Sequence, residues 1–159
     1  MTLFVILPFM DWLESLVLIV PGFVACTEFG FFVFVRPILG RLPERFQLEV
    51  EQGLLRTYGR LMPIYTGIAV ILLLIYALRF TQNSTANRAV WIAVFFFSAA
   101  AATSIWLDQE IENAILTWNP EQLPADWKFV RRRWIIAQGL RSSLQLAGFI
   151  LFCISLGAR

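Results

Sequence analysis

Residues 61–78 read LMPIYTGIAVILLLIYAL, a segment that is almost wholly apolar and contains no charged residue. A run of about 20 such residues is typical of a helix that crosses a membrane. Three further segments have the same character and contain at most one charged residue each: residues 15–35, 89–107 and 134–158. We therefore predict four membrane-spanning helices, at about residues 12–35, 61–79, 89–113 and 134–157.

The composition of the chain argues against several classes of protein. Of its 159 residues 58% are hydrophobic, and the mean hydropathy is +0.70, whereas soluble domains are roughly 45 to 50% apolar. The net charge of +2 is too small to favour binding to nucleic acid. The chain has no His, and its only two cysteines, Cys26 and Cys153, lie inside apolar runs. Zinc sites, His-based triads and disulfide scaffolds are therefore not expected, and neither is a cofactor.

The predicted spans imply an all-α fold. Backbone polar groups in lipid must be satisfied within each span, which favours helices, and four helices in one short chain pack as a bundle. We expect an integral membrane four-helix bundle that forms a single domain over residues 1–159. Residues 42–57 mix apolar and charged side chains at helical spacing, which predicts a short interfacial amphipathic helix between spans one and two.

The distribution of Lys and Arg predicts the orientation in the membrane. Five of these residues lie between spans one and two and four lie between spans three and four, whereas the other side receives only Arg79, Arg88 and Arg159. Loops rich in Lys and Arg face the cytoplasm. We expect both long loops in the cytoplasm, both termini on the non-cytoplasmic side, and location in the inner membrane if the source is bacterial.

Two charged residues lie within the predicted spans. Glu28 is seven residues before Val35, and Arg141 is seven residues after Trp134. At 1.5 Å per residue each lies about 10 Å inside the cytoplasmic boundary, so we expect the two side chains to form a pair. Because charge inside a membrane is costly, a structural ion pair and a ligand or catalytic site are about equally plausible roles.

Further polar residues gather at the same end of the predicted bundle. We expect Glu28, Asn113, Gln138 and Arg141 to line one cavity, because they come from three spans and lie at similar depth. Its aromatic walls are expected to be Phe29, Tyr65 and Trp134. The alternative is a closed polar cluster with no room for a guest. Asp108 lies close by, although a solvated helix end explains it more simply.

The second half of the chain carries a motif with a family resemblance. It comprises NAILTWNP at residues 113–120, LPADW at 123–127 and RRRW at 131–134, followed by Arg141. This pattern resembles a family of small four-span membrane proteins that was long labelled a domain of unknown function and includes the anthrone oxygenases. GFVACTEFG at residues 22–30 and the following Arg36-Pro37 are compatible with that family, so the resemblance covers nearly the whole chain.

The resemblance implies oxygenation of a flat polycyclic phenol without metal or flavin. Such chemistry needs a base to remove a C–H proton and donors to hold the resulting oxyanion. The expected catalytic residues are Glu28, Asn113 and Arg141, and the expected ligand-binding residues are Tyr65, Asp108, Trp134 and Gln138.

A second hypothesis is a non-enzymatic membrane module. It would bind a lipid, a quinone-like molecule or a partner membrane subunit, or it would form a homo-oligomer, and the Glu28–Arg141 pair would then be architectural. A transporter is less well supported, because four spans lack the broken helices and paired repeats of that class. The sequence leaves the first two alternatives open.

Overall fold

Four long helical segments make up the part of the protein that the structure describes. The structure, a computed structural model, describes residues 12–79 and 85–157, except the side chains of Thr85, Leu107 and Asp108. The first segment comprises α1 (Trp12–Gly30), η1 (Phe31–Val35) and α2 (Arg36–Leu39); the second comprises α3 (Glu44–Leu54), η2 (Leu55–Gly59) and α4 (Arg60–Arg79). The third comprises α5 (Thr85–Thr103), η3 (Ser104–Asp108) and α6 (Gln109–Thr117), and the fourth is α7 (Trp127–Gly157).

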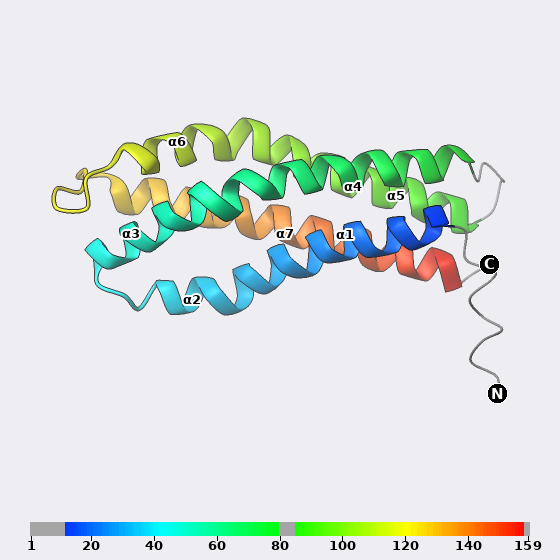
Figure 1. The fold of residues 1–159 in the computed structure, drawn as a ribbon, viewed down its shortest axis with the longest axis horizontal. Helices are drawn as coiled ribbons and strands as arrows, with labels where there is room; N and C mark the ends of the chain where they lie inside the picture. Colours follow the sequence, from blue (N-terminus) through cyan, green and yellow to red (C-terminus); the bar gives the residue numbers. More distant parts are fainter. Residues whose placement is uncertain (1–11, 80–84, 158–159) are drawn as a thin grey trace.

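The four segments pack side by side with alternating direction, so that α1 begins and α7 ends at the same end of an elongated bundle (Figure 1). This arrangement confirms the predicted all-α four-helix bundle. Each segment is long and apolar enough to cross a membrane by length and composition. Large apolar side chains such as Ile64, Ile71 and Leu78 are more than half exposed on α4. These features are compatible with a multi-pass membrane protein.

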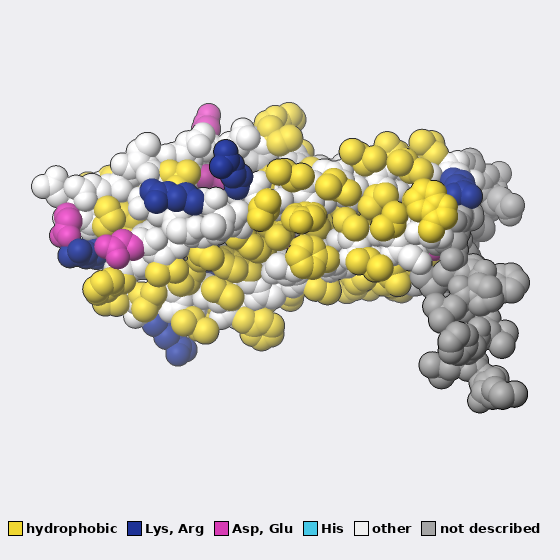
Figure 2. Space-filling model, in the orientation of Figure 1, with side chains coloured by type: hydrophobic (Ala, Val, Ile, Leu, Met, Phe, Trp, Pro, Cys, Tyr) yellow, Lys and Arg dark blue, Asp and Glu magenta, His cyan; other side chains and the backbone are white. Residues whose placement is uncertain are grey.

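The interior changes in character along the bundle. We call the half that contains α2, α3, α6 and the first part of α7 the loop-side half, and the other half, where α1 begins and α7 ends, the terminal-side half. The main apolar core fills the terminal-side half and includes Leu73, Tyr76, Phe97 and Phe152, all fully buried. A smaller cluster in the loop-side half surrounds Trp134. Most of the charged side chains on the face in Figure 2 also gather over the loop-side half.

The helices of the loop-side half extend beyond the predicted spans. The expected amphipathic helix is present as α3, but it continues through η2 into α4 without a break and packs through Gln47, Leu48, Glu51 and Gln52. The Gln52 amide donates to the carbonyl oxygens of Ile115 and Trp118 at 2.9 Å, which ties α3 to the end of α6. The predicted spans end at charged residues, whereas the helices continue past them, and three charged residues of these extensions, Arg36, Glu51 and Arg131, are paired with one another.

Two glycines fix the register of α1 against α7. A Cβ atom placed on Gly22 would lie 2.8 Å from the ring of Phe149, and one on Gly139 would lie 2.6 Å from the ring of Phe32. The two helices therefore approach closely at both positions, as small residues permit. Because the helices are antiparallel, this register brings Glu28 opposite the turn of α7 that holds Arg141.

Three π-helical turns, η1, η2 and η3, lie in three different segments at the loop-side half. In an unbroken α-helix, which turns by about 100° per residue, Arg36 would lie about 80° from Glu28 around the axis. The extra residue of a π-turn reduces this offset to about 20°. The turn at η1 therefore brings Glu28 and Arg36 onto the same inward face. Such turns occur frequently at functional sites.

Candidate functional site

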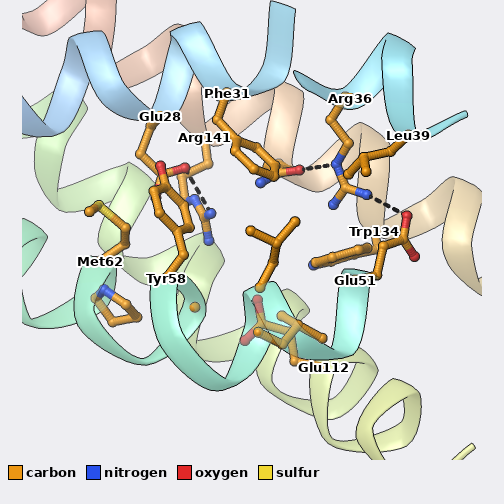
Figure 3. A pocket seen from close by; sticks show the side chains of 15 residues that line it. Glu28, Phe31, Arg36, Leu39, Glu51, Tyr58, Met62, Glu112, Trp134 and Arg141 are labelled. Atoms are coloured by element: carbon orange, nitrogen blue, oxygen red, sulfur yellow. Dashed lines mark hydrogen bonds and ion pairs between the residues drawn. The ribbon is translucent and has the colours of Figure 1, made fainter. Parts of the chain in front are cut away.

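The predicted pair between Glu28 and Arg141 is present in the loop-side half. Arg141 Nη2 donates to Glu28 Oε2 at 3.0 Å, and the two residues are 6% and 1% exposed. Arg141 Nη1 also donates to the hydroxyl of Ser104 at 3.2 Å. The guanidinium of Arg141 therefore joins α7 to both α1 and η3, and the prediction of a buried ion pair is confirmed (Figure 3).

A second ionic cluster lies beside this pair and centres on Glu51. The Oε1 atom of Glu51 accepts from Arg36 Nη1 at 3.1 Å and from Arg131 Nε at 2.9 Å. Arg36 Nε in turn donates to Gln138 Oε1 at 2.6 Å (Figure 3). Glu51 and Arg36 are almost completely buried. Removing one partner of such a pair leaves an uncompensated buried charge, so the cluster depends on all its members.

Aromatic rings surround the guanidinium of Arg36. Its Cζ atom lies 3.8 Å from the centre of the Trp134 ring and 5.9 Å from that of Phe31. The first distance is that of a close cation–π contact, which stabilises a desolvated guanidinium. Tyr58 stacks on Phe31, with ring centres 5.1 Å apart and planes inclined by 19°. These rings form the apolar walls between the two ionic groups.

A small cavity lies between Glu28, Arg36, Tyr58, Trp134 and Arg141. We call it the inner pocket. Its free volume is about 20 Å³, which is enough for one water-sized group. In this conformation the inner pocket accepts a single polar group and excludes a ring system.

A larger groove adjoins the inner pocket and is about 630 Å³ in volume. It shares Arg141 and Glu112 with the inner pocket, and it lies between the η2–α4 region and the η3–α6 region. Its remaining walls include Arg56, Arg60 and Asn113, together with apolar side chains. Drug-sized ligands occupy cavities of roughly 300 to 1,000 Å³, so the groove has the volume for the body of a small ligand.

The inner pocket contains hydrogen-bond donors that the described residues do not satisfy. Arg36 Nη2, Trp134 Nε1 and the Tyr58 hydroxyl are buried and form no hydrogen bond with any described residue. Arg36 and Trp134 are at least nine-tenths buried as whole residues. Buried polar atoms normally have a partner, and a missing partner costs about 1 to 3 kcal/mol. Three such donors around one cavity are suited to an acceptor group.

The structure brings together most of the residues expected to form the site. Glu28, Trp134, Gln138 and Arg141 line the inner pocket. Asn113 does not; it is exposed and lines the groove, which it shares with Arg141. The expectation that Asn113 joins Glu28 in one cavity is therefore corrected to two adjoining spaces.

Two predicted residues lie elsewhere. Tyr65 is 39% exposed and contacts Phe23 edge to face, with ring centres 5.7 Å apart. It lies beside the buried stripe of α4 that runs through Met62, Thr66 and Ala69, which is why it does not reach the pocket. Phe29 lines neither space, and the side chain of Asp108 lies outside the described part of the chain.

Sequence reasoning missed Arg36 and Glu51. The sequence places both in the charged region between spans one and two. One signal for Glu51 was available, because it lies three residues after Leu48 and four before Leu55, on the apolar face of the amphipathic helix. A carboxylate on such a face needs a buried partner. Arg36 had no comparable signal, because its inward position depends on η1.

No group of three or more His, Cys, Asp or Glu side chains suited to a metal ion occurs within residues 12–79 and 85–157 as described. Comparison of the chain with protein families, curated proteins and solved structures found no match. The function is therefore inferred from the geometry of the pocket and groove.

Proposed function

We propose that this protein is a multi-pass membrane protein that binds a small flat or amphiphilic molecule at the loop-side half of its bundle. An acceptor group of the ligand, such as a carbonyl, phenolate or carboxylate oxygen, enters the inner pocket, and the ligand body lies in the groove. The observation that carries this proposal is the set of buried donors without an acceptor: Arg36 Nη2, Trp134 Nε1 and the Tyr58 hydroxyl.

The sizes of the two spaces support this division of the ligand. The inner pocket accommodates one polar group, whereas the adjoining groove is large enough for a ring system or part of an alkyl chain. Apolar ligands partition into the bilayer, and a binding site at membrane depth would receive them from there. A flat aromatic molecule with an oxygen substituent satisfies both requirements, and so does a quinone.

The proposed orientation places the loop-side half toward the cytoplasm. It rests on the excess of Lys and Arg in the two long loops. Single cysteines introduced at Glu44 and Asp126, in a background with Cys26 and Cys153 replaced by Ser, test the orientation. We expect an impermeant maleimide to label both positions in inside-out vesicles and neither in intact cells. Labelling of both positions in intact cells would mean that the topology is opposite to the proposed one.

A catalytic role of the anthrone oxygenase type remains a second candidate. The same donors would stabilise an oxyanion formed when a phenolic substrate loses a C–H proton. A base is also needed, and Arg141 already engages Oε2 of Glu28, which leaves Oε1 as the oxygen that would accept the proton. Binding therefore has better support than catalysis, and the catalytic roles of Glu28, Arg141 and Asn113 remain predictions.

A ligand titration with a neutral quinone tests the binding function. Full-length protein in a non-ionic detergent is titrated with 1,4-naphthoquinone, whose carbonyl oxygens are acceptors only, and the dissociation constant is measured by equilibrium dialysis. We expect Tyr58→Phe to weaken binding by about fivefold, since one hydrogen bond contributes about 1 kcal/mol, while its stacking on Phe31 is retained. Tyr65→Phe is the matched control, because this hydroxyl lies outside the pocket, and it should leave binding unchanged.

The alternative is a structural module whose polar interior serves only to hold the helices together. In that case 1,4-naphthoquinone would not bind, and neither would 2-naphthoate or 2-naphthamide. If naphthoquinone does bind, equal dissociation constants for the Tyr58→Phe and Tyr65→Phe variants would show that it does not use the inner pocket.

A further inference from the structure

We infer that the groove selects an anionic amphiphile, with one negative group bound near Arg60, in addition to the acceptor oxygen that enters the inner pocket, and an apolar body along the groove wall. This inference rests on the proposed function and adds the charge of the ligand. The groove is lined by three arginines, Arg56, Arg60 and Arg141, and by only one carboxylate among its described lining residues, Glu112. Charge complementarity therefore favours a negative ligand.

Arg56 and Arg60 are available to a ligand. They are four residues apart and both side chains are exposed, and neither forms an ion pair or hydrogen bond within the described part of the chain. Arg45 is also exposed but contacts both Glu49 and Glu121. Other exposed arginines, such as Arg133, do not line the groove, whereas Arg56 and Arg60 do. Within the described part of the chain, the groove therefore has two arginines that form no ion pair.

Glu112 is the one carboxylate among the described residues that line the groove, against three arginines, and the other two carboxylates of the inner pocket are already paired. Glu28 is paired with Arg141, and Glu51 is shared by Arg36 and Arg131. The buried charges of the inner pocket are thus compensated, and the unsatisfied atoms that remain there belong to donors. An anion with oxygen acceptors suits both spaces, whereas a cation suits neither.

The apolar part of the groove defines the rest of the ligand. Its walls include Leu55, Pro63, Ile105 and Leu116. Figure 2 shows basic side chains over the α3–α4 region where the continuous hydrophobic surface ends. A molecule that places its charge among these basic groups would extend its apolar body toward the hydrophobic surface. The shared chemistry is a carboxylate or phosphate on an apolar body, whether from a lipid or from a smaller aromatic acid.

The inference is tested with two probes of nearly equal size and different charge. The anion 2-naphthoate and the neutral 2-naphthamide are titrated at pH 7.5 into the full-length protein in a non-ionic detergent, and dissociation constants are measured by equilibrium dialysis. We expect naphthoate to bind at least tenfold more tightly. Arg60→Gln should remove most of this preference, whereas the control Arg133→Gln, an exposed arginine outside the groove, changes the net charge equally and should preserve it.

The outcomes separate the inference from the proposed function. If naphthamide binds as tightly as naphthoate, or if Arg60→Gln and Arg133→Gln behave alike, the anionic preference is wrong although binding remains. If none of naphthoate, naphthamide and 1,4-naphthoquinone binds, the proposed function is wrong as well. A second titration in nanodiscs identifies the source of the anion. Displacement of bound naphthoate by phosphatidylglycerol but not by phosphatidylcholine supports a lipid. If naphthoate stays bound in the presence of phosphatidylglycerol, a smaller acid is supported.

Discussion

The interiors of the two halves of the bundle are filled by different kinds of side chain. The terminal-side half closes around apolar side chains such as Leu73, Phe97 and Phe152, which are fully buried. The loop-side half instead buries Glu28, Arg36, Glu51 and Arg141. An apolar core is complete by itself, whereas a charged core requires matched partners, and here several buried donors, including Arg36 Nη2, Trp134 Nε1 and the Tyr58 hydroxyl, form no hydrogen bond with the described residues. This difference is why we place the function in the loop-side half.

The same helices contribute to both halves. Helix α7 presents Trp134, Gln138 and Arg141 to the loop-side interior and then Gly148 and Phe152 to the terminal-side interior. These residues share one inward face, so the change from polar to apolar follows from residue type alone. The π-turns η1, η2 and η3 occur only where the described interior is polar. Irregular helix geometry therefore coincides with the candidate site.

The largest effect is expected from breaking the ionic cluster of the loop-side half. Glu51→Gln keeps the shape of the side chain but leaves Arg36 buried without its negative partner. We expect a loss of about 3 to 5 kcal/mol in the free energy of unfolding, measured by titration with SDS in mixed micelles. Glu49→Gln on the same helix is the matched control, because Glu49 and its partner Arg45 are exposed, and its cost should be below about 1 kcal/mol. Equal costs would show that the Glu51 cluster is solvated.

An intermediate effect is expected from a double-mutant cycle on Glu28 and Arg141. Glu28→Gln and Arg141→Gln should each destabilise the protein, because each leaves a buried charge without its partner. The double variant should cost less than the sum of the two, with a coupling energy of about 1 to 3 kcal/mol. Additive costs, measured by the same SDS titration, would mean that the 3.0 Å contact contributes no net pairing energy.

The sequence predicts the interior of the terminal-side half more completely than that of the loop-side half. Long uncharged runs identify helices, and a single charge inside a run, such as Glu28 or Arg141, must find a partner because lipid offers none. Arg36 and Glu51 lie beyond the uncharged runs, in a region rich in charged residues, so the sequence predicts that they are exposed to water. Their burial depends on helices that continue past the spans and on the π-turn at η1, and neither feature has a periodic signature in the sequence.

The smallest effect is expected when one Tyr in each half of the bundle is replaced by Phe. This pair of variants also compares the two halves most directly. In the terminal-side half the Tyr76 hydroxyl donates to Glu14 Oε1 at 3.1 Å, so Tyr76→Phe should cost about 0.5 to 1.5 kcal/mol. In the loop-side half the Tyr58 hydroxyl has no partner among the described residues, so without ligand Tyr58→Phe should change the free energy of unfolding little or raise it. Saturating 1,4-naphthoquinone should stabilise the unmodified protein and the Tyr76→Phe variant more than Tyr58→Phe. If Tyr58→Phe destabilises the ligand-free protein as much as Tyr76→Phe does, the Tyr58 hydroxyl is already satisfied, and the donors that distinguish the loop-side half are not available to a ligand.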